Sequence, residues 1–297
     1  DPKMTFDVNV GGGVNLLEAV RQCDTVRALV FITSDKCYEN LEWIWGYRET
    51  DAMGGHDPYS ASKGAAELVF SSYLRSFFAN RPDFGAATAR AGNVIGGGDW
   101  AADRIVPDCV RALQAGKPIT IRSPRATRPW QHVLDSLHGY LQLAESLVRN
   151  GAASAEAWNF GPGEASSINV GQLATRLSNL WGDHASWQLE PGQQPHESRT
   201  LKLDASKARR DLGWQPVLPL EETLRFVVAW YRAHHAGQDM RTFTLQQIEA
   251  FEVLGCKVRQ LTFDGSGLGG FRVGVGLGDT EVDDLHCPIV REHDVVR

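Results

Sequence analysis

Residues 28–37 read ALVFITSDKC and residues 57–64 read DPYSASKG, and these two stretches decide the expected fold. The run ALVFI is continuously apolar, which is typical of a parallel strand buried on both faces. Three polar residues follow this strand directly: Ser34, Asp35 and Lys36. Because functional sites of open α/β sheets lie beyond the carboxyl ends of the strands, we expect a site at this edge. A simple turn, in which the aspartate caps its own backbone, is the alternative.

The second stretch begins a helix that we expect to run from Pro58 to about Phe78, with Asp57 as its N-cap. Tyr59 and Lys63 are four residues apart, so their side chains lie one turn apart on one face of this helix. A nearby cation lowers the pKa of a tyrosine by roughly 1 to 3 units, which favours acid–base chemistry. Taken alone, this spacing is also compatible with a tyrosine and a lysine that are simply exposed on an ordinary helix.

The rest of the chain alternates between helical and strand patterns, which predicts an α/β fold with a Rossmann-like, doubly wound parallel sheet. We expect further strands at 85–91, at 118–122 and near Trp158, and helices at 5–23, 105–115, 134–149, 170–180, 205–212 and 220–234. We therefore divide the chain into three parts. Residues 1–160 are expected to form a partial Rossmann-like catalytic domain with interleaved substrate segments, and residues 161–252 a smaller, mainly substrate-binding lobe. Residues 253–297 form a glycine-rich tail without an assignment.

The composition argues against several classes of protein. A formal net charge of −6 over 297 residues disfavours nucleic-acid and anionic-membrane partners. No apolar run is long enough for a membrane helix, and the first residues lack the pattern of a signal peptide. The five cysteines form no CxxC motif and no zinc spacing. We therefore expect a cytoplasmic protein with reduced thiols and no metal site.

Three ordered motifs together resemble the extended short-chain dehydrogenases: TSDK after a strand, YSASK on the next helix, and ARAGNVIGG after the following strand. The segments TSDKCYENLEWIWGYRE, GGGDWAADRIVPD, RPWQHVLD and LGWQP are most similar to the CDP-glucose 4,6-dehydratase branch of that family. The resemblance implies an NAD-dependent lyase that acts on a nucleotide sugar. It would oxidise the sugar at C4, remove water across C5 and C6, and return the hydride to C6. A 4-epimerase of the same fold and a truncated, non-catalytic sugar-nucleotide-binding fragment are the alternatives.

The resemblance also assigns catalytic roles. Tyr59 matches the base for oxidation at C4, and Lys63 matches the lysine that tunes it and holds the nicotinamide ribose. Ser34 matches the hydroxyl that hydrogen-bonds the C4 oxygen. Asp35 matches the acid that protonates the departing C6 hydroxyl, which requires burial to keep it neutral. Lys36 matches the base that removes the C5 proton.

Other residues are expected to bind ligands or a second subunit. The resemblance assigns Ala91 to the cofactor, and it assigns the sugar and pyrophosphate contacts to Asn93, Arg104 and Arg128; guanidinium suits a bidentate phosphate contact. Three tryptophans either wall the pocket or serve ordinary packing: Trp43, Trp45 and Trp100. In the family, the helices expected at 5–23 and 58–78 pair across a two-fold axis, so a homodimer is expected.

A glycine fingerprint after a first strand, which binds the cofactor pyrophosphate in this family, is not found at the expected place. The GxGxxG pattern formed by Gly265, Gly267 and Gly270 is followed by FRVGVGLGD, which is poorly suited to begin a phosphate-binding helix. The 297-residue chain alone is therefore expected to bind NAD poorly and to have little dehydratase activity.

Overall fold

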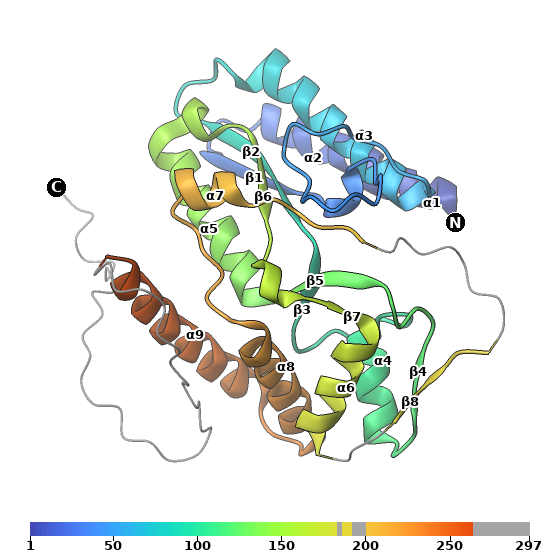
Figure 1. The fold of residues 1–297 in the computed structure, drawn as a ribbon. Coiled ribbons are helices and arrows are strands. Elements are labelled where there is room, and N and C mark those ends of the chain that lie inside the picture. Colours follow the sequence, from blue (N-terminus) through green and yellow to red (C-terminus); the bar gives the residue numbers. More distant parts are fainter. Residues whose placement is uncertain (183–185, 192–199, 264–297) are drawn as a thin grey trace.

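A computed structural model describes residues 1–182, 186–191 and 200–263 of the chain (Figure 1). Its central sheet is parallel, with β1 (Ala28–Ile32), β2 (Gly85–Ala91) and β6 (Ala157–Phe160) in the order β1-β2-β6. The strand predicted from ALVFI is thus confirmed at the edge of the described sheet. Strand β2 is buried along its whole length, and its small side chains (GAATARA) let helices pack closely on both of its faces.

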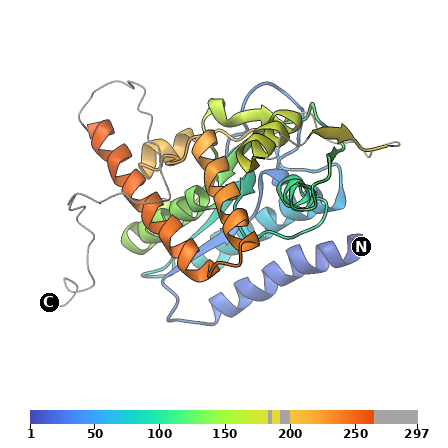
Figure 2. The same cartoon turned by 90° about the horizontal axis from the view of Figure 1, so that it is seen from below.

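Helices cover both faces of this sheet. On one face lie α2 (Gly12–Arg21) and α3 (Pro58–Tyr73), whose core with the sheet includes Leu17, Phe31 and Phe70. On the other face lies α5 (Val133–Asn150), packed with Leu143, Trp158 and Phe160, and the short α7 (Ser206–Asp211) adjoins it. Figures 1 and 2 show these two helical layers. The predicted Rossmann-like α/β class is confirmed.

The two predicted helices at the amino-terminal side are confirmed, each with one wide turn. Helix α1 (Pro2–Phe6) continues through a π-turn, Asp7–Gly11, into α2. Helix α3 likewise continues through a π-turn, Leu74–Phe78. At its start, the Asp57 side chain accepts a hydrogen bond from Ser60 N at 3.0 Å, so the predicted N-cap is present. This cap fixes the turn of helix that carries Tyr59.

A second core forms the lower part of the molecule in Figure 1. Helices α4 (Ile105–Gln114), α6 (Val170–Trp181) and α8 (Leu220–His235) surround it, with a large shared set of buried side chains that includes Leu113, Leu173 and Val227. The small sheets of this part are β3-β5-β7 and β4-β8. Their strands are β3 (Asn93–Ile95), β4 (Ile119–Ile121), β5 (Thr127–His132), β7 (Ser167–Asn169) and β8 (Trp187–Leu189).

Several elements differ from the expectation. Strands β3, β5, β7 and β8 were not predicted, because three are only three residues long and β5 contains Pro129, which normally argues against a strand. Helix α9 (Met240–Phe263) runs past residue 253, so residues 253–263, assigned above to the glycine-rich tail, are helical. The predicted pattern at Gly265–Gly270 lies outside the described residues.

Asp135, the last residue of the motif RPWQHVLD, contacts the motif LGWQP and the two residues that follow it. Asp135, at the start of α5, accepts hydrogen bonds from Val217 N at 2.6 Å and Leu218 N at 3.4 Å. Its backbone oxygen accepts one from Trp214 Nε1 at 3.2 Å. Burial raises the pKa of Asp135 to about 7, although these backbone bonds lower it. Asp135 therefore joins the start of α5 to the LGWQP turn.

In the part of the chain that the structure describes, no helix combines the length and the apolar character needed to cross a membrane.

Candidate active site

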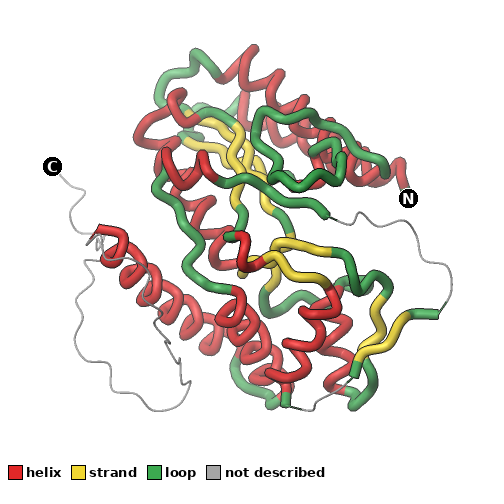
Figure 3. Tube along the Cα trace, in the orientation of Figure 1, coloured by secondary structure: helices red, strands yellow, loops and turns green. Residues whose placement is uncertain are grey.

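A cavity of about 640 Å³ lies beyond the carboxyl ends of β1 and β2 and reaches α4. This volume suits a small-molecule ligand. The cavity brings together most of the predicted site residues: Ser34, Asp35, Lys36, Tyr59, Asn93, Arg104 and Arg128. Most of the segment between β1 and α3, which delivers the first of them, is loop (Figure 3). Lys63 and Ala91 are not among its lining residues.

Ser34 and Asp35 form a hydrogen-bonded pair at the end of β1. Ser34 Oγ donates to Asp35 Oδ1 at 3.0 Å and accepts from Lys36 N at 3.2 Å, so the serine caps the short 3-10 turn Asp35–Cys37. Asp35 is only 5% exposed. Burial raises its pKa, and the charge of Lys36, the Ser34 hydrogen bond and the charge of Arg128 oppose that effect. The environment thus favours the neutral acid.

Tyr59 lies in the first turn of α3 and is 46% exposed. Burial raises its pKa, a hydrogen bond with Ser34 lowers it, and the charge of Asp35 raises it further. Lys63 Nζ lies over the Tyr59 ring, 5.7 Å from its centroid, and burial lowers the pKa of Lys63. The expectation that Lys63 leaves Tyr59 with a lowered pKa is therefore wrong for this structure, because burial of the phenol outweighs the opposing contacts. The hydrogen bond that lowers the pKa of Tyr59 against burial comes from Ser34.

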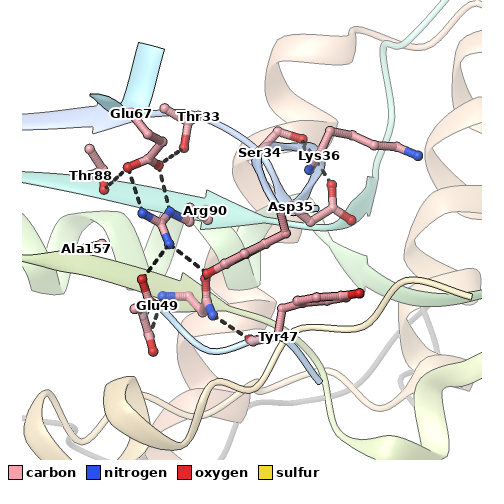
Figure 4. A network of polar contacts seen from close by, with 12 residues as sticks. Thr33, Ser34, Asp35, Lys36, Tyr47, Glu49, Glu67, Thr88, Arg90 and Ala157 are labelled. Atoms are coloured by element: carbon pink, nitrogen blue, oxygen red, sulfur yellow. Dashed lines mark hydrogen bonds and ion pairs between the residues drawn. The ribbon is translucent and has the colours of Figure 1, made fainter. Parts of the chain in front are cut away.

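Lys36 lies between two cavities. It lines the cavity of about 640 Å³ and also a neighbouring one of about 740 Å³, whose other lining residues include Met53 and His56. Figure 4 shows its side chain extending away from the buried interior of the sheet. The ammonium can therefore face a ligand in the first cavity while its charge acts on Asp35.

The remaining predicted ligand contacts differ in burial. Arg128, on β5, is 5% exposed and donates to Thr127 O at 2.9 Å. Arg104 precedes α4 and is exposed, with an ion pair to Asp99 at 3.2 Å. Asn93 begins β3 at the rim of the cavity. A buried and an exposed guanidinium on the wall of one cavity suit an anionic ligand.

The three tryptophans do not line this cavity. Trp43 stacks on Tyr47 with ring centroids 5.0 Å apart, and both Trp43 and Trp45 line a separate cavity of about 550 Å³. Trp100 packs edge-on against Tyr231 at 5.2 Å. Of the two alternatives given for them, packing is the one observed for Trp43 and Trp100.

A buried ion pair that was not predicted from the sequence lies beside the site, between Glu67 on α3 and Arg90 on β2. Its two contacts measure 2.7 and 2.8 Å, and the residues are 2% and 1% exposed. Figure 4 shows the pair surrounded by polar partners and next to Ser34 and Asp35. A charged residue inside the apolar strand GAATARA was the available signal, since buried charges require a partner.

Comparison with known proteins places the chain in a family. The family described as GDP-mannose 4,6 dehydratase matches residues 1–227. The chain belongs to this family. CDP-glucose 4,6-dehydratase from Salmonella typhimurium is 49% identical over 254 residues, which are 84% of this chain and 71% of that protein. CDP-paratose 2-epimerase from Salmonella typhi is 25% identical, over 77% of this chain and 72% of that protein.

Solved structures agree in fold. An epimerase from Methanothermobacter thermautotrophicus superposes with a TM-score of 0.69 at 22% identity, covering 82% of this chain and 69% of the epimerase. A dTDP-glucose 4,6-dehydratase from Bacillus anthracis, solved in complex with NAD, superposes with a TM-score of 0.65 at 21% identity, covering 78% of this chain and 70% of the dehydratase. The predicted dehydratase family, enzyme class and fold are confirmed.

Proposed function

We propose that this chain carries the active site of an NAD-dependent CDP-glucose 4,6-dehydratase, which converts CDP-glucose to CDP-4-keto-6-deoxyglucose. The observation that carries the proposal is the buried Asp35, held by Ser34 next to Tyr59 in one cavity. Elimination of water needs an acid that is still protonated when the C6 hydroxyl leaves, and burial raises the pKa of Asp35 in that direction. A 4-epimerase would need Tyr59 but no such acid.

The first step is oxidation at C4. Tyr59 takes the proton of the C4 hydroxyl, and Ser34 hydrogen-bonds the C4 oxygen. Because Ser34 and Tyr59 line the same cavity, the Ser34 hydroxyl can hold the sugar oxygen whose proton Tyr59 removes. A hydrogen bond with Ser34 also lowers the pKa of Tyr59 against the effect of burial.

The second step is elimination across C5 and C6. Lys36 is assigned as the base whose nitrogen removes the C5 proton, while Asp35 donates its proton to the C6 hydroxyl, which leaves as water. The C5–H and C6–O bonds break and a C5–C6 double bond forms. Hydride addition at C6 and return of the proton to C5 then give the 4-keto-6-deoxy product.

The residues on α3 fit the nicotinamide end of NAD. Tyr59 offers a hydroxyl, and Lys63 offers a half-buried ammonium on the same helix face, which together suit the ribose hydroxyls. NAD, when bound, accepts the hydride from C4 and supplies it to C6. Ala91 ends β2 at the same edge of the sheet, and its assignment to the cofactor stays a prediction. The described residues include no glycine-rich fingerprint for the pyrophosphate.

The nucleotide sugar is assigned to the opposite side of the cavity. Arg128 and Arg104 would bind the pyrophosphate, and Asn93 would bind the sugar. The choice of CDP rests on the relative from Salmonella typhimurium at 49% identity. A cytoplasmic location stays a prediction.

We also propose a homodimer through α1, α2 and α3. These helices and the π-turns that continue them carry large apolar side chains that are exposed: Met4, Val8, Leu16, Leu68 and Phe77. Exposed apolar groups gathered on neighbouring helices are typical of an interface between subunits.

Product analysis tests the proposed reaction. The intact protein is incubated with CDP-glucose and NAD, and the mass of the sugar nucleotide is measured by mass spectrometry. Loss of one water is expected, with deuterium moved from C4 to C6 when the C4-deuterated substrate is used. A product of unchanged mass with inverted C4 would establish the epimerase instead, and unchanged substrate would favour a binding fragment.

A further inference from the structure

We propose that the buried Glu67–Arg90 pair is a positioning device that holds the two halves of the active site in register, an inference that rests on the proposed function. One half is the segment Ser34–Lys36 at the end of β1. The other half is the face of α3 that carries Tyr59 and Lys63. The two halves come from separate elements and must meet within hydrogen-bonding distance.

The pair contacts the strand segment from both sides. Thr33, directly before Ser34, donates a hydrogen bond from Oγ1 to Glu67. Tyr38 follows the 3-10 turn that contains Asp35, and its hydroxyl accepts a hydrogen bond from Arg90 Nη1 at 2.7 Å. One ion pair thus holds the residue before the reactive segment and a residue just after it.

The same pair is built into the catalytic helix. Glu67 lies on α3 one turn after Lys63 and two turns after Tyr59, because four residues make about one turn. Its carboxylate binds Arg90 through two parallel contacts at 2.7 and 2.8 Å. A bidentate contact restricts rotation as well as distance, so a displacement of α3 would be resisted in more than one direction.

Stability alone is a poor explanation for this pair. A buried ion pair carries a desolvation cost, and apolar residues of similar volume often stabilise a core as well. The network does satisfy its members, since Thr88 Oγ1 donates to Glu67 at 2.9 Å and the Tyr38 hydroxyl donates to Asn159 at 2.8 Å. Directional contacts of this kind specify a geometry, which an apolar cluster does not.

Two threonines allow a matched test. Thr33 and Thr88 both donate to the Glu67 carboxylate, but only Thr33 adjoins the reactive segment, whereas Thr88 lies within β2. Thr33→Val and Thr88→Val make the same chemical change and are expected to lower the melting temperature by similar amounts. For dehydration in the intact protein, Thr33→Val should lower kcat about 10-fold or more with KM for the sugar nucleotide nearly unchanged. Thr88→Val should keep kcat within about twofold.

Thr33→Ser keeps the donor and should restore kcat, which a purely structural role of the threonine methyl group would not predict. Equal kcat values for the two valine variants, or no recovery in Thr33→Ser, would overturn the positioning role. If Thr33→Val does not fold, Tyr38→Phe replaces it, with the same expected loss in kcat. A parent protein that releases no dehydrated product would instead contradict the proposed function.

Discussion

Ser34 Oγ donates to the buried Asp35 carboxyl at 3.0 Å, and both residues line the cavity that Tyr59 also lines. One cavity therefore presents the residue proposed to oxidise C4 together with the residue proposed to expel the C6 hydroxyl. A sugar in this cavity can meet both groups without changing its place. Separate substitutions distinguish the contributions of the two groups.

Asp35→Asn should block dehydration while sparing C4 oxidation. The asparagine keeps the size and the Ser34 contact but has no acidic proton, so release of the 4-keto-6-deoxy product should fall by about 100-fold or more. Single-turnover absorbance of the reduced cofactor, combined with product analysis, measures both steps. Asp103→Asn, an exposed carboxylate on the wall of the same cavity, is the control and should leave kcat nearly unchanged.

The same residue predicts a pH dependence. Burial raises the pKa of Asp35, so the protonated acid persists to a higher pH than for an ordinary aspartate. On the alkaline side, dehydration should fall as the pH rises through that raised pKa, whereas C4 oxidation should not follow this limb. An alkaline limb of kcat common to both steps would show that another group is responsible.

Lys36→Met should stop the reaction at the 4-keto stage. Methionine fills similar space without an amine, so the C5 proton has no base, and the reduced cofactor should accumulate in a single turnover. Lys117→Met, at an exposed lysine away from the cavity, is the matched control. Release of product by Lys36→Met at near the parental rate would show that the base is wrongly assigned.

The sequence predicted those parts of the site that depend on local pattern. The strand ALVFI and the helix capped by Asp57 are confirmed, and their order along the chain was enough to bring Ser34 and Tyr59 to one cavity. The family resemblance, which rests on short ordered motifs, is confirmed by the comparison at 49% identity.

What the sequence could not give depends on distant contacts. Glu67 and Arg90 are separated by more than twenty residues, and only the parallel packing of β1 and β2 beneath α3 brings them together. The raised pKa of Tyr59 depends on burial of its phenol by the folded chain and not on the spacing to Lys63. Strand β5 was missed because Pro129 lies within it, at a place where it pairs with the short β7.

The proposed dimer predicts a change of mass with one surface substitution. Leu68→Glu places a charge among the exposed apolar side chains of α1 and α3, where a partner subunit would bury it at a cost of several kcal/mol. Light scattering at micromolar concentration should give a dimer for the parent protein and a monomer for this variant. Leu141→Glu, at an exposed leucine on α5, is the control and should remain dimeric. A folded parent protein that is monomeric would contradict the proposal.

Asp135 should make the stability of the fold depend on pH. Its pKa is raised from 3.8 to about 7 in the folded state, so the folded protein holds this proton more tightly than the unfolded chain does. The resulting stabilisation is fully present below about pH 4 and is lost as the pH rises towards about 7. Asp135→Asn has no such proton. The free energy of unfolding of the parent should therefore fall by a few kcal/mol relative to that of the variant between pH 4 and pH 8.

Urea denaturation across this pH range measures the effect. Asparagine retains one oxygen that can accept from Val217 N, so the variant should fold, and Asp24→Asn, on the exposed turn after α2, serves as the control with little effect at any pH. Because Asp135 joins α5 to the LGWQP turn and is not among the residues that line the cavity, kcat of the folded variant should stay near the parental value. A stability difference that is constant between pH 5 and pH 8 would show that Asp135 stays ionised in the folded protein, held by its two backbone donors.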